Sequence, residues 1–273
     1  MKEQDPLNEE WDNLIILDAC RYDFFKRNYQ DYLSGELEKR KSKASNTGEW
    51  LTKNFKEKYD ITYISANPYV NNFGIPLNKC HPKFEYEWKA TDHFKQIINV
   101  WATSWDRDLG TVHPREVNMQ FFRTKIQGNK KILHYLQPHM PHLSETSVGS
   151  WANTINRVKK GDKLESFQNW LRPRLRKRIG KLNYWKIRKL LNLEPRNPFE
   201  VAWRKKDPTE IKEKYEDNLI KVLDTVSNLI EEINGKTIVT ADHGEAFGEK
   251  GIWEHPPKTH IPELTTVPWL KTK

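Results

Sequence analysis

Residues 237–244 read TIVTADHG, a short run of apolar and β-branched residues that ends in a carboxylate, an imidazole and a glycine. The first half of this run is typical of a buried strand. Open α/β sheets present their functional groups just beyond the carboxyl ends of such strands. Asp242 and His243 offer an oxygen and a nitrogen ligand, a set suited to Zn²⁺ or Mn²⁺. We expect Gly244 to let the backbone turn sharply beside them.

A second strand end of the same kind lies near the N-terminus, where residues 13–18 read NLIILD. Four consecutive apolar residues are typical of a strand that is buried on both faces, as in the core of a parallel sheet. The run ends in Asp18, which is a third candidate ligand. Two such strands in one parallel sheet would bring their carboxyl ends to the same edge.

Strand-like and helix-like segments alternate along the chain. We expect strands over residues 14–17, 61–65, 97–102, 132–136, 236–240 and 265–269, and helices over 47–58, 114–126 and 208–233. The last helix has apolar residues at three- and four-residue spacing, and it is bounded by Pro208 at its start and Gly235 at its end. This alternation predicts an α/β protein, a three-layer α/β/α sandwich around a mostly parallel sheet.

A hydroxyl-rich turn precedes the first predicted helix, where residues 43–51 read KASNTGEWL. Ser, Thr and Asn are favoured at helix N-caps, and the N-terminus of a helix attracts anions. A hydroxyl from Ser45 or Thr47, an anion-attracting helix start and the ligands from the two strand ends can therefore converge in one site.

These residues together resemble the alkaline phosphatase superfamily in its sulfatase-like branch. The motif style is similar to that of the phosphoethanolamine transferases and lipoteichoic acid synthases, and the resemblance spans Asp18 to Pro268. Those families use an acidic residue after the first strand, a threonine nucleophile and an Asp-His pair around one divalent ion. Their His-x-Pro segment, which contacts the phosphoryl group, is matched by His139-Met140-Pro141. The resemblance implies an alkaline phosphatase-like fold.

The resemblance also implies a set of site residues. The expected metal ligands are Asp18, Thr47, Asp242 and His243. Thr47 is the expected nucleophile, with Ser45 as the alternative. The expected substrate contacts are His139, His255 and, more weakly, Arg21, and one of the two histidines would also protonate the leaving oxygen. Zn²⁺ or Mn²⁺ suits this ligand set better than Mg²⁺ or Ca²⁺, and His139 with His255 leaves room for a second ion.

These residue types predict a metal-dependent hydrolase or transferase that acts on phosphate monoesters or diesters. A divalent cation lowers the pKa of a bound oxygen, so Thr47 could attack phosphorus and form a phospho-threonine intermediate. Water or an alcohol would then release the phosphoryl group. A sulfatase is less favoured because the chain has no C/S-x-P-x-R motif, and Asp18-Ala19 replaces the double Asp of many sulfatases. The remaining alternative is a non-catalytic basic adaptor.

Residues 157–189 differ from the rest of the chain in charge. They contain thirteen Lys or Arg and two acidic residues, a net charge of +11 against +9 for the whole protein. We interpret them as part of a basic helical insertion, at about residues 144–207, in a single catalytic domain of residues 1–273. Aromatic and aliphatic residues between the charges favour peripheral contact with an anionic membrane, although a solvated helical flap has the same composition.

The expected substrates are a phosphorylated small molecule, a lipid headgroup or an anionic glycan. Nucleic acid is not an expected partner, because no known nucleic-acid motif is present. The polar N-terminus has no apolar centre of a signal peptide, and no apolar run reaches eighteen residues. Cys20 and Cys80 do not suggest a disulfide framework. We therefore expect a cytoplasmic protein, with peripheral membrane binding as an option.

Overall fold

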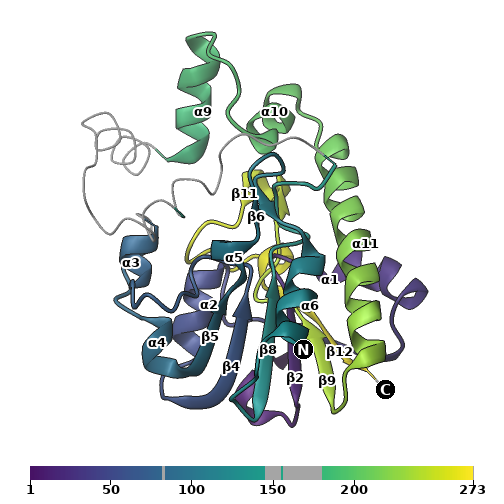
Figure 1. Cartoon of the computed structure of the whole chain (residues 1–273). Coiled ribbons are helices and arrows are strands. Elements are labelled where there is room, and N and C mark those ends of the chain that lie inside the picture. The colour runs from purple at the N-terminus through teal and green to yellow at the C-terminus, as the bar shows by residue number, and fades with distance from the viewer. Residues whose placement is uncertain (82–83, 145–154, 156–179, 273) are drawn as a thin grey trace.

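The protein is built on an eight-stranded, mostly parallel sheet (Figure 1). The computed structural model describes residues 1–81, 84–144, 155 and 180–272. The sheet has the strand order β1-β3-β12-β9-β2-β8-β4-β5. The five strands from β9 to β5 run parallel to one another, whereas β12 pairs antiparallel with both β9 and β3. The carboxyl ends of β9, β2, β8 and β4 therefore meet at one edge.

The strands are β1 Lys2–Glu3, β2 Asn13–Leu17, β3 Gly35–Lys41, β4 Tyr59–Ser65, β5 Phe94–Asn99, β6 Trp105–Asp106, β7 Thr111–Val112, β8 Lys130–Tyr135, β9 Thr237–Thr240, β10 Ala246–Phe247, β11 Trp253–Glu254 and β12 Thr266–Thr272. The helices are α1 Tyr22–Asn28, α2 Thr47–Asn54, α3 Leu77–Cys80, α4 Ala90–His93, α5 Val100–Thr103, α6 Pro114–Arg123, α9 Lys181–Leu190, α10 Pro198–Lys205, α11 Thr209–Glu232 and α12 Pro262–Thr265. Short 3-10 turns cover Pro6–Asn8, Tyr29–Asp31 and Glu249–Gly251.

Both faces of the sheet are covered, which confirms the predicted α/β class. Successive residues of β2 belong to different apolar clusters: Ile15 and Leu17 pack with residues of α1, α6 and α11, whereas Leu14 and Ile16 pack with residues of α2. This division follows from the period of two in a strand, because neighbouring side chains point to opposite faces. The core is therefore divided into two layers by the sheet.

Helix α11 is the longest described helix, and it lies along the first of these layers (Figure 1). Its buried positions include Ile211, Tyr215 and Leu219, at the four-residue spacing that places side chains on one face. The helix ends one residue before Ile233, and Gly235 then takes a φ of +99°, which favours glycine. The chain passes from there directly into β9.

The six predicted strands are all present, with shifts at their ends. The strand expected over 97–102 is β5 at Phe94–Asn99, and residues 100–103 form α5 instead. The helix expected to reach residue 58 ends at Asn54. The sequence analysis missed β3, whose sequence GELEKRK is strongly charged. This strand is held by backbone pairing with β1 and β12, and its sequence has no apolar alternation from which a strand could be predicted.

The predicted basic insertion is described only in part. Residues 145–154 and 156–179 lie outside the described residues, and so does most of the segment of net charge +11. Its described portion contains α9 and α10, which lie above the carboxyl edge of the sheet in Figure 1. The boundaries of the insertion stay a prediction.

Candidate active site

The candidate site lies at the carboxyl edge of the parallel strands. Asp18 directly follows β2, and Asp242 lies two residues beyond β9, which pairs with β2. Both residues are buried: the exposed fraction is 2% for Asp18 and 0% for Asp242. Each is anchored through one oxygen. Asp18 Oδ2 accepts a hydrogen bond from Asn67 Nδ2 at 2.8 Å, and Asp242 Oδ1 accepts from the backbone N–H groups of Ala19 and His243 at 3.1 and 2.9 Å.

The second oxygen of each carboxylate faces the same imidazole nitrogen. His243 Nε2 lies 3.4 Å from Asp242 Oδ2 and 3.7 Å from Asp18 Oδ1. It also lies 3.4 Å from the Thr47 hydroxyl. Ligands 2.0–2.1 Å from a tetrahedral ion are separated from one another by about 3.3 Å. The three distances from His243 Nε2 therefore fit ligands that share a divalent cation.

Two further observations support a metal in this place. Asp242 Oδ2 is a buried oxygen without a hydrogen-bond partner in the described structure, which is costly unless a ligand satisfies it. His243 Nδ1 lies 2.8 Å from the carbonyl oxygen of Gly244, so Nδ1 donates to that oxygen and Nε2 is the nitrogen that faces the carboxylates. An imidazole fixed in this orientation offers Nε2 to a metal.

Within the cluster, the Asp18 carboxylate and the His243 imidazole shift each other's pKa in the directions that favour their charged forms. Burial alone would raise the pKa of Asp18, but the neighbouring imidazoles of His134, His139 and His243 hold that pKa well below its usual range. Burial lowers the pKa of His243, but the Asp242 and Asp18 carboxylates outweigh that effect and raise it. Asp18 therefore stays a carboxylate throughout the physiological range, as a metal ligand must.

The hydroxyls of Ser45 and Thr47 have different surroundings. Ser45 Oγ donates to the Pro256 carbonyl at 3.0 Å and accepts from the Thr259 backbone at 3.2 Å. Thr47 is the first residue of α2, and Asn46 caps this helix by accepting from the Glu49 backbone at 3.0 Å. The Thr47 hydroxyl thus lies at a helix N-terminus and faces His243, whereas Ser45 holds two loops together.

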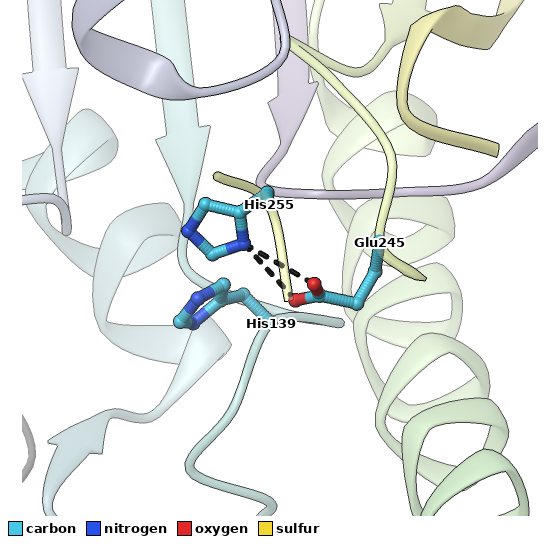
Figure 2. A group of neighbouring side chains, drawn as sticks. All are labelled: His139, Glu245 and His255. Atoms are coloured by element: carbon cyan, nitrogen blue, oxygen red, sulfur yellow. Dashed lines mark hydrogen bonds and ion pairs between the residues drawn. The ribbon is translucent and has the colours of Figure 1, made fainter. Parts of the chain in front are cut away.

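A second group of side chains lies beside the first. Figure 2 shows the Glu245 carboxylate facing the ring of His255, with His139 next to it. His255 Nδ1 lies 3.2 Å from Glu245 Oε2, and the rings of His139 and His255 are 4.9 Å apart. The rings of His243 and His255 are separated by 4.7 Å, so the two groups adjoin. One ligand atom from each of His139, Glu245 and His255 lies within 4.8 Å of the others.

Burial shapes the protonation of this second group. It raises the pKa of Glu245 to about 7. It lowers the pKa of His139, which the Asp18 carboxylate only partly offsets. Glu245 therefore changes protonation near neutrality, as acids and bases in catalysis do, whereas burial favours the neutral form of His139.

Sequence analysis missed Glu245 and His134. His134 lies inside β8, where its Nε2 is 3.6 Å from Asp18 Oδ2 and its Nδ1 is 2.9 Å from the Tyr63 hydroxyl. The available signal was its register, since β8 pairs with β2 and His134 lies opposite Ile16, near Asp18. Ligand atoms of Asp18, His134 and Asp242 also lie within 4.8 Å of one another.

Two neighbouring residues have structural contacts beside the site. Arg21 donates to Asp23, to Glu249 at 2.7 Å and to the Glu245 carbonyl, so it ties the loop after β2 to the ribbon of β10 and β11. Its expected contact with a substrate stays a prediction. Gly244 is needed for space, because a Cβ there would lie 2.1 Å from the Glu263 carbonyl oxygen. Its backbone N–H bonds to Leu264, so the glycine allows close contact with α12.

The turn after β2 is the strained part of the site. Ala19 takes a φ of 59°, a left-handed conformation that costs a residue with a Cβ about 1–2 kcal/mol. Its N–H donates to Asp242, and its carbonyl accepts from the Tyr215 hydroxyl at 2.6 Å. These bonds couple the strain at Ala19 to the position of Asp242 and to α11.

No known protein family matches the sequence, and no curated protein does. Solved structures do match the fold. The integral membrane protein lipooligosaccharide phosphoethanolamine transferase A from Neisseria meningitidis aligns over 100% of this chain and 50% of its own, with a TM-score of 0.54 and 11% identity. Its soluble domain aligns over 100% of this chain and 80% of its own, with a TM-score of 0.53 and 12% identity. The C-terminal periplasmic domain of phosphoethanolamine transferase EptC from Campylobacter jejuni aligns over 95% and 77%, with a TM-score of 0.45 and 13% identity.

The chain therefore has the fold of the phosphoethanolamine transferase soluble domains, which are members of the alkaline phosphatase superfamily. This confirms the resemblance at the level of fold. The chain spans half the length of the first neighbour.

The expected cytoplasmic location is wrong. The first neighbour is an integral membrane protein, which points away from the cytoplasm. Within the described residues, none of the helices has the length and apolar character that crossing a bilayer requires.

Proposed function

We propose that the protein is a metal-dependent phosphotransferase in which Thr47 receives a phosphoryl group from a phosphate ester. The observation that carries the proposal is the convergence of the Thr47 hydroxyl, at the N-terminus of α2, with His243 Nε2 and the two buried carboxylates. The transferase activity named for the two neighbours of TM-score 0.54 and 0.53 agrees with this chemistry.

The chain offers a complete ligand set for one divalent ion. Asp18, Asp242 and His243 would hold it together with the Thr47 oxygen, a mixture of oxygen and nitrogen donors that suits Zn²⁺ or Mn²⁺ better than Mg²⁺. When bound, such an ion supplies a Lewis acid that acidifies the threonine hydroxyl and draws charge from the phosphoryl oxygens. His134 Nε2 faces Asp18 Oδ2 at 3.6 Å and supports that carboxylate electrostatically.

The protein groups divide the first half-reaction among them. The bond from Thr47 Oγ1 to phosphorus forms while the bond from phosphorus to the leaving oxygen breaks, and the hydroxyl proton passes to solvent water. Backbone N–H groups at the start of α2 face the phosphoryl oxygens. His139 donates to those oxygens, and His255 Nε2 gives a proton to the leaving oxygen while Glu245 holds its Nδ1.

The second half-reaction separates transfer from hydrolysis. An acceptor alcohol that attacks the phospho-threonine completes a transfer, and water completes a hydrolysis. We favour transfer, with a lipid headgroup phosphoester as the substrate class, because the neighbours are named as transferases acting on a lipooligosaccharide. A phosphorylated small molecule or an anionic glycan would be bound by the same groups.

The test compares three chromogenic esters under identical conditions: p-nitrophenyl phosphate, bis-p-nitrophenyl phosphate and p-nitrophenyl sulfate. We expect turnover of a phosphate ester that Thr47→Ala abolishes, with little turnover of the sulfate. Faster turnover of the sulfate would favour a sulfatase. Turnover of no ester, with metal-free protein, would favour the non-catalytic adaptor.

Peripheral membrane contact is the second part of the proposal. Residues 157–179, which suggested it, lie outside the described residues. The described end of the basic segment supports it, because Ile187, Leu190, Leu191 and Leu193 are exposed by 43%, 85%, 62% and 45% beside Lys186 and Lys189. Exposed aliphatic residues among lysines favour the interface of an anionic bilayer.

A further inference from the structure

A cavity of about 450 Å³ lies between the helices α9 to α11 and the ribbon of β10 and β11. Its walls include three lysines and three aromatic residues: Lys189, Lys206, Lys212, Trp203, Phe247 and Trp253. Its volume falls within the range of about 300–1,000 Å³ that small-molecule sites occupy. None of the metal ligands or catalytic residues assigned above lines it.

The cavity carries an uncompensated positive charge. Among the residues that the structure describes, no carboxylate lies within ion-pair distance of Lys189, Lys206 or Lys212. Glu249 is the acidic residue in the wall, and both of its oxygens are occupied, one by Arg21 at 2.7 Å and the other by the Phe247 backbone at 2.6 Å. Lys side chains are strong phosphate-binding groups when no internal anion neutralises them. The cavity therefore suits an anion.

The backbone at Lys206 is also unusual. It ends α10 with a φ of 57°, a position where glycine or asparagine is preferred. A lysine there carries a conformational cost, because its Cβ crowds the backbone. Strained positions often persist for a functional reason, and the strain therefore supports a functional role for the Lys206 side chain.

Aromatic rings form the apolar part of the wall. Trp203 and Trp253 both contact the buried Trp185, with ring centroids 5.7 and 6.2 Å apart, so the two wall residues are held in place from behind. The Lys212 ammonium lies 6.0 Å from the centre of the Phe247 ring. Rigid aromatic walls beside cations favour a ligand that joins a flat apolar face to an anionic group.

The cavity adjoins the candidate active site through one short ribbon. Phe247 pairs with Trp253, and both line the cavity. Glu245 lies two residues before Phe247, and His255 lies two residues after Trp253. Two residues of strand span about 7 Å. A ligand in the cavity is therefore within the length of a small molecule from the proposed proton donor.

We propose that this cavity is a second anion site, which binds the phosphate of a phosphorylated sugar or a similar phosphorylated ring compound. Lys206 and Lys212 contact the phosphate, and the aromatic walls contact the ring. In the context of the proposed function, on which this part rests, the cavity holds a remote anionic group of the same substrate whose phosphoester reaches Thr47.

The experiment measures binding apart from catalysis. Glucose 6-phosphate is titrated into the full chain carrying Asp242→Ala, and the heat of binding gives Kd at low ionic strength. We expect saturable binding, with Kd raised about five- to tenfold by Lys206→Ala and by Lys212→Ala. Glucose without the phosphate should not bind measurably, and inorganic phosphate should bind more weakly than glucose 6-phosphate.

Lys205→Ala is the matched control. Lys205 is exposed, adjacent in sequence to Lys206 and paired with Glu210, so its loss removes the same charge from outside the cavity. We expect it to change Kd less than twofold. Equal effects of Lys205→Ala and Lys206→Ala would overturn the proposal, because they would show diffuse attraction to a basic surface.

Two other outcomes would also overturn the proposal. The first is no saturable binding of glucose 6-phosphate. The second is Lys206-dependent binding only to vesicles of phosphatidylglycerol and phosphatidylcholine, because that result would assign these lysines to a membrane surface. The measurement is independent of the proposed function. If Lys206-dependent binding occurs while no phosphate ester is turned over by the unmodified protein, the proposed function fails and the anion site stands.

Discussion

The hydroxyl of Thr47 lies 3.4 Å from Nε2 of His243, although 196 residues separate them in the chain. His243 follows β9, whereas Thr47 follows β3 and begins α2. The intervening β12 pairs with both β3 and β9, which brings these two segments to the same edge of the sheet. The relationship therefore depends on the antiparallel pairing of β12 as much as on the parallel core.

Thr47→Ala should reduce phosphate ester turnover by roughly 10³-fold or more, because it removes the nucleophile. Ser45→Ala should leave the rate constant within a few-fold and lower the free energy of unfolding by about 1 kcal/mol, through loss of its two hydrogen bonds. Initial rates and urea unfolding measure the two effects. Intact-mass spectrometry of quenched reactions should show a phosphoryl adduct in the Ser45→Ala protein and none in the Thr47→Ala protein. The reverse pattern would assign the nucleophile to Ser45.

Metal removal should destabilise the protein. A metal ion whose free concentration is one hundred times its Kd adds about 2.7 kcal/mol to the free energy of unfolding. Removal of the ion by a chelator should therefore lower Tm by several degrees. Asp242→Ala should bring the metal content to background and make Tm insensitive to chelator. Asp60→Asn is the control, because Asp60 is a carboxylate paired with Lys95 on the surface. Metal content by mass spectrometry that is equal in the Asp242→Ala and unmodified proteins would refute the ligand set.

The stability of the metal-free protein should depend on Glu245 between about pH 5 and 7. Burial raises the pKa of Glu245 from 4.5 to about 7, so the folded state binds its proton more tightly than the unfolded state. The resulting contribution to the free energy of unfolding is fully present below the Glu245 pKa of the unfolded state. It is lost as the pH rises through the Glu245 pKa of the folded state, and the total decline is about 3 kcal/mol. Glu245→Gln should remove this decline in urea unfolding, whereas Glu232→Gln at the exposed end of α11 should retain it. An unchanged decline in the Glu245→Gln protein would contradict the assignment.

Membrane binding should depend on the aliphatic end of α9. The double change Leu190→Glu and Leu191→Glu should reduce binding to phosphatidylglycerol vesicles at least fivefold in a sedimentation assay, because it replaces apolar contact by repulsion. Phe122→Glu is the control, since Phe122 is 50% exposed on α6. Equal losses in the two proteins, or no vesicle binding by the unmodified protein, would rule out this surface.

Much of the fold could be predicted from local patterns. The apolar runs at residues 14–17 and 237–240 specified buried strands, and the polar residues after them placed Asp18 and Asp242 at strand ends. Strand β3 could not be predicted in this way, because its charged sequence has no apolar period. It is formed by pairing with neighbours that are distant in the chain.

The candidate site shows the same division. The residue types at Asp18, Thr47 and His243 indicated the chemistry, and the structure brings them together. His134 and Glu245 were missed because their contacts depend on register and on loop folding: His134 reaches Asp18 only through the pairing of β8 with β2, and Glu245 reaches His255 through the ribbon of β10 and β11.

The amino-acid sequence by itself determined six of the eight strands of the sheet, the longest described helix and the chemical groups that follow β2 and β9, because periodicity and residue type act over a few neighbouring residues. Only the tertiary structure decided which oxygen of Asp242 is anchored and which faces His243, which hydroxyl lies in the site, and where a basic cavity forms beside it. These properties depend on contacts between residues far apart in the chain, whose geometry is set by packing of the whole sheet and its helices.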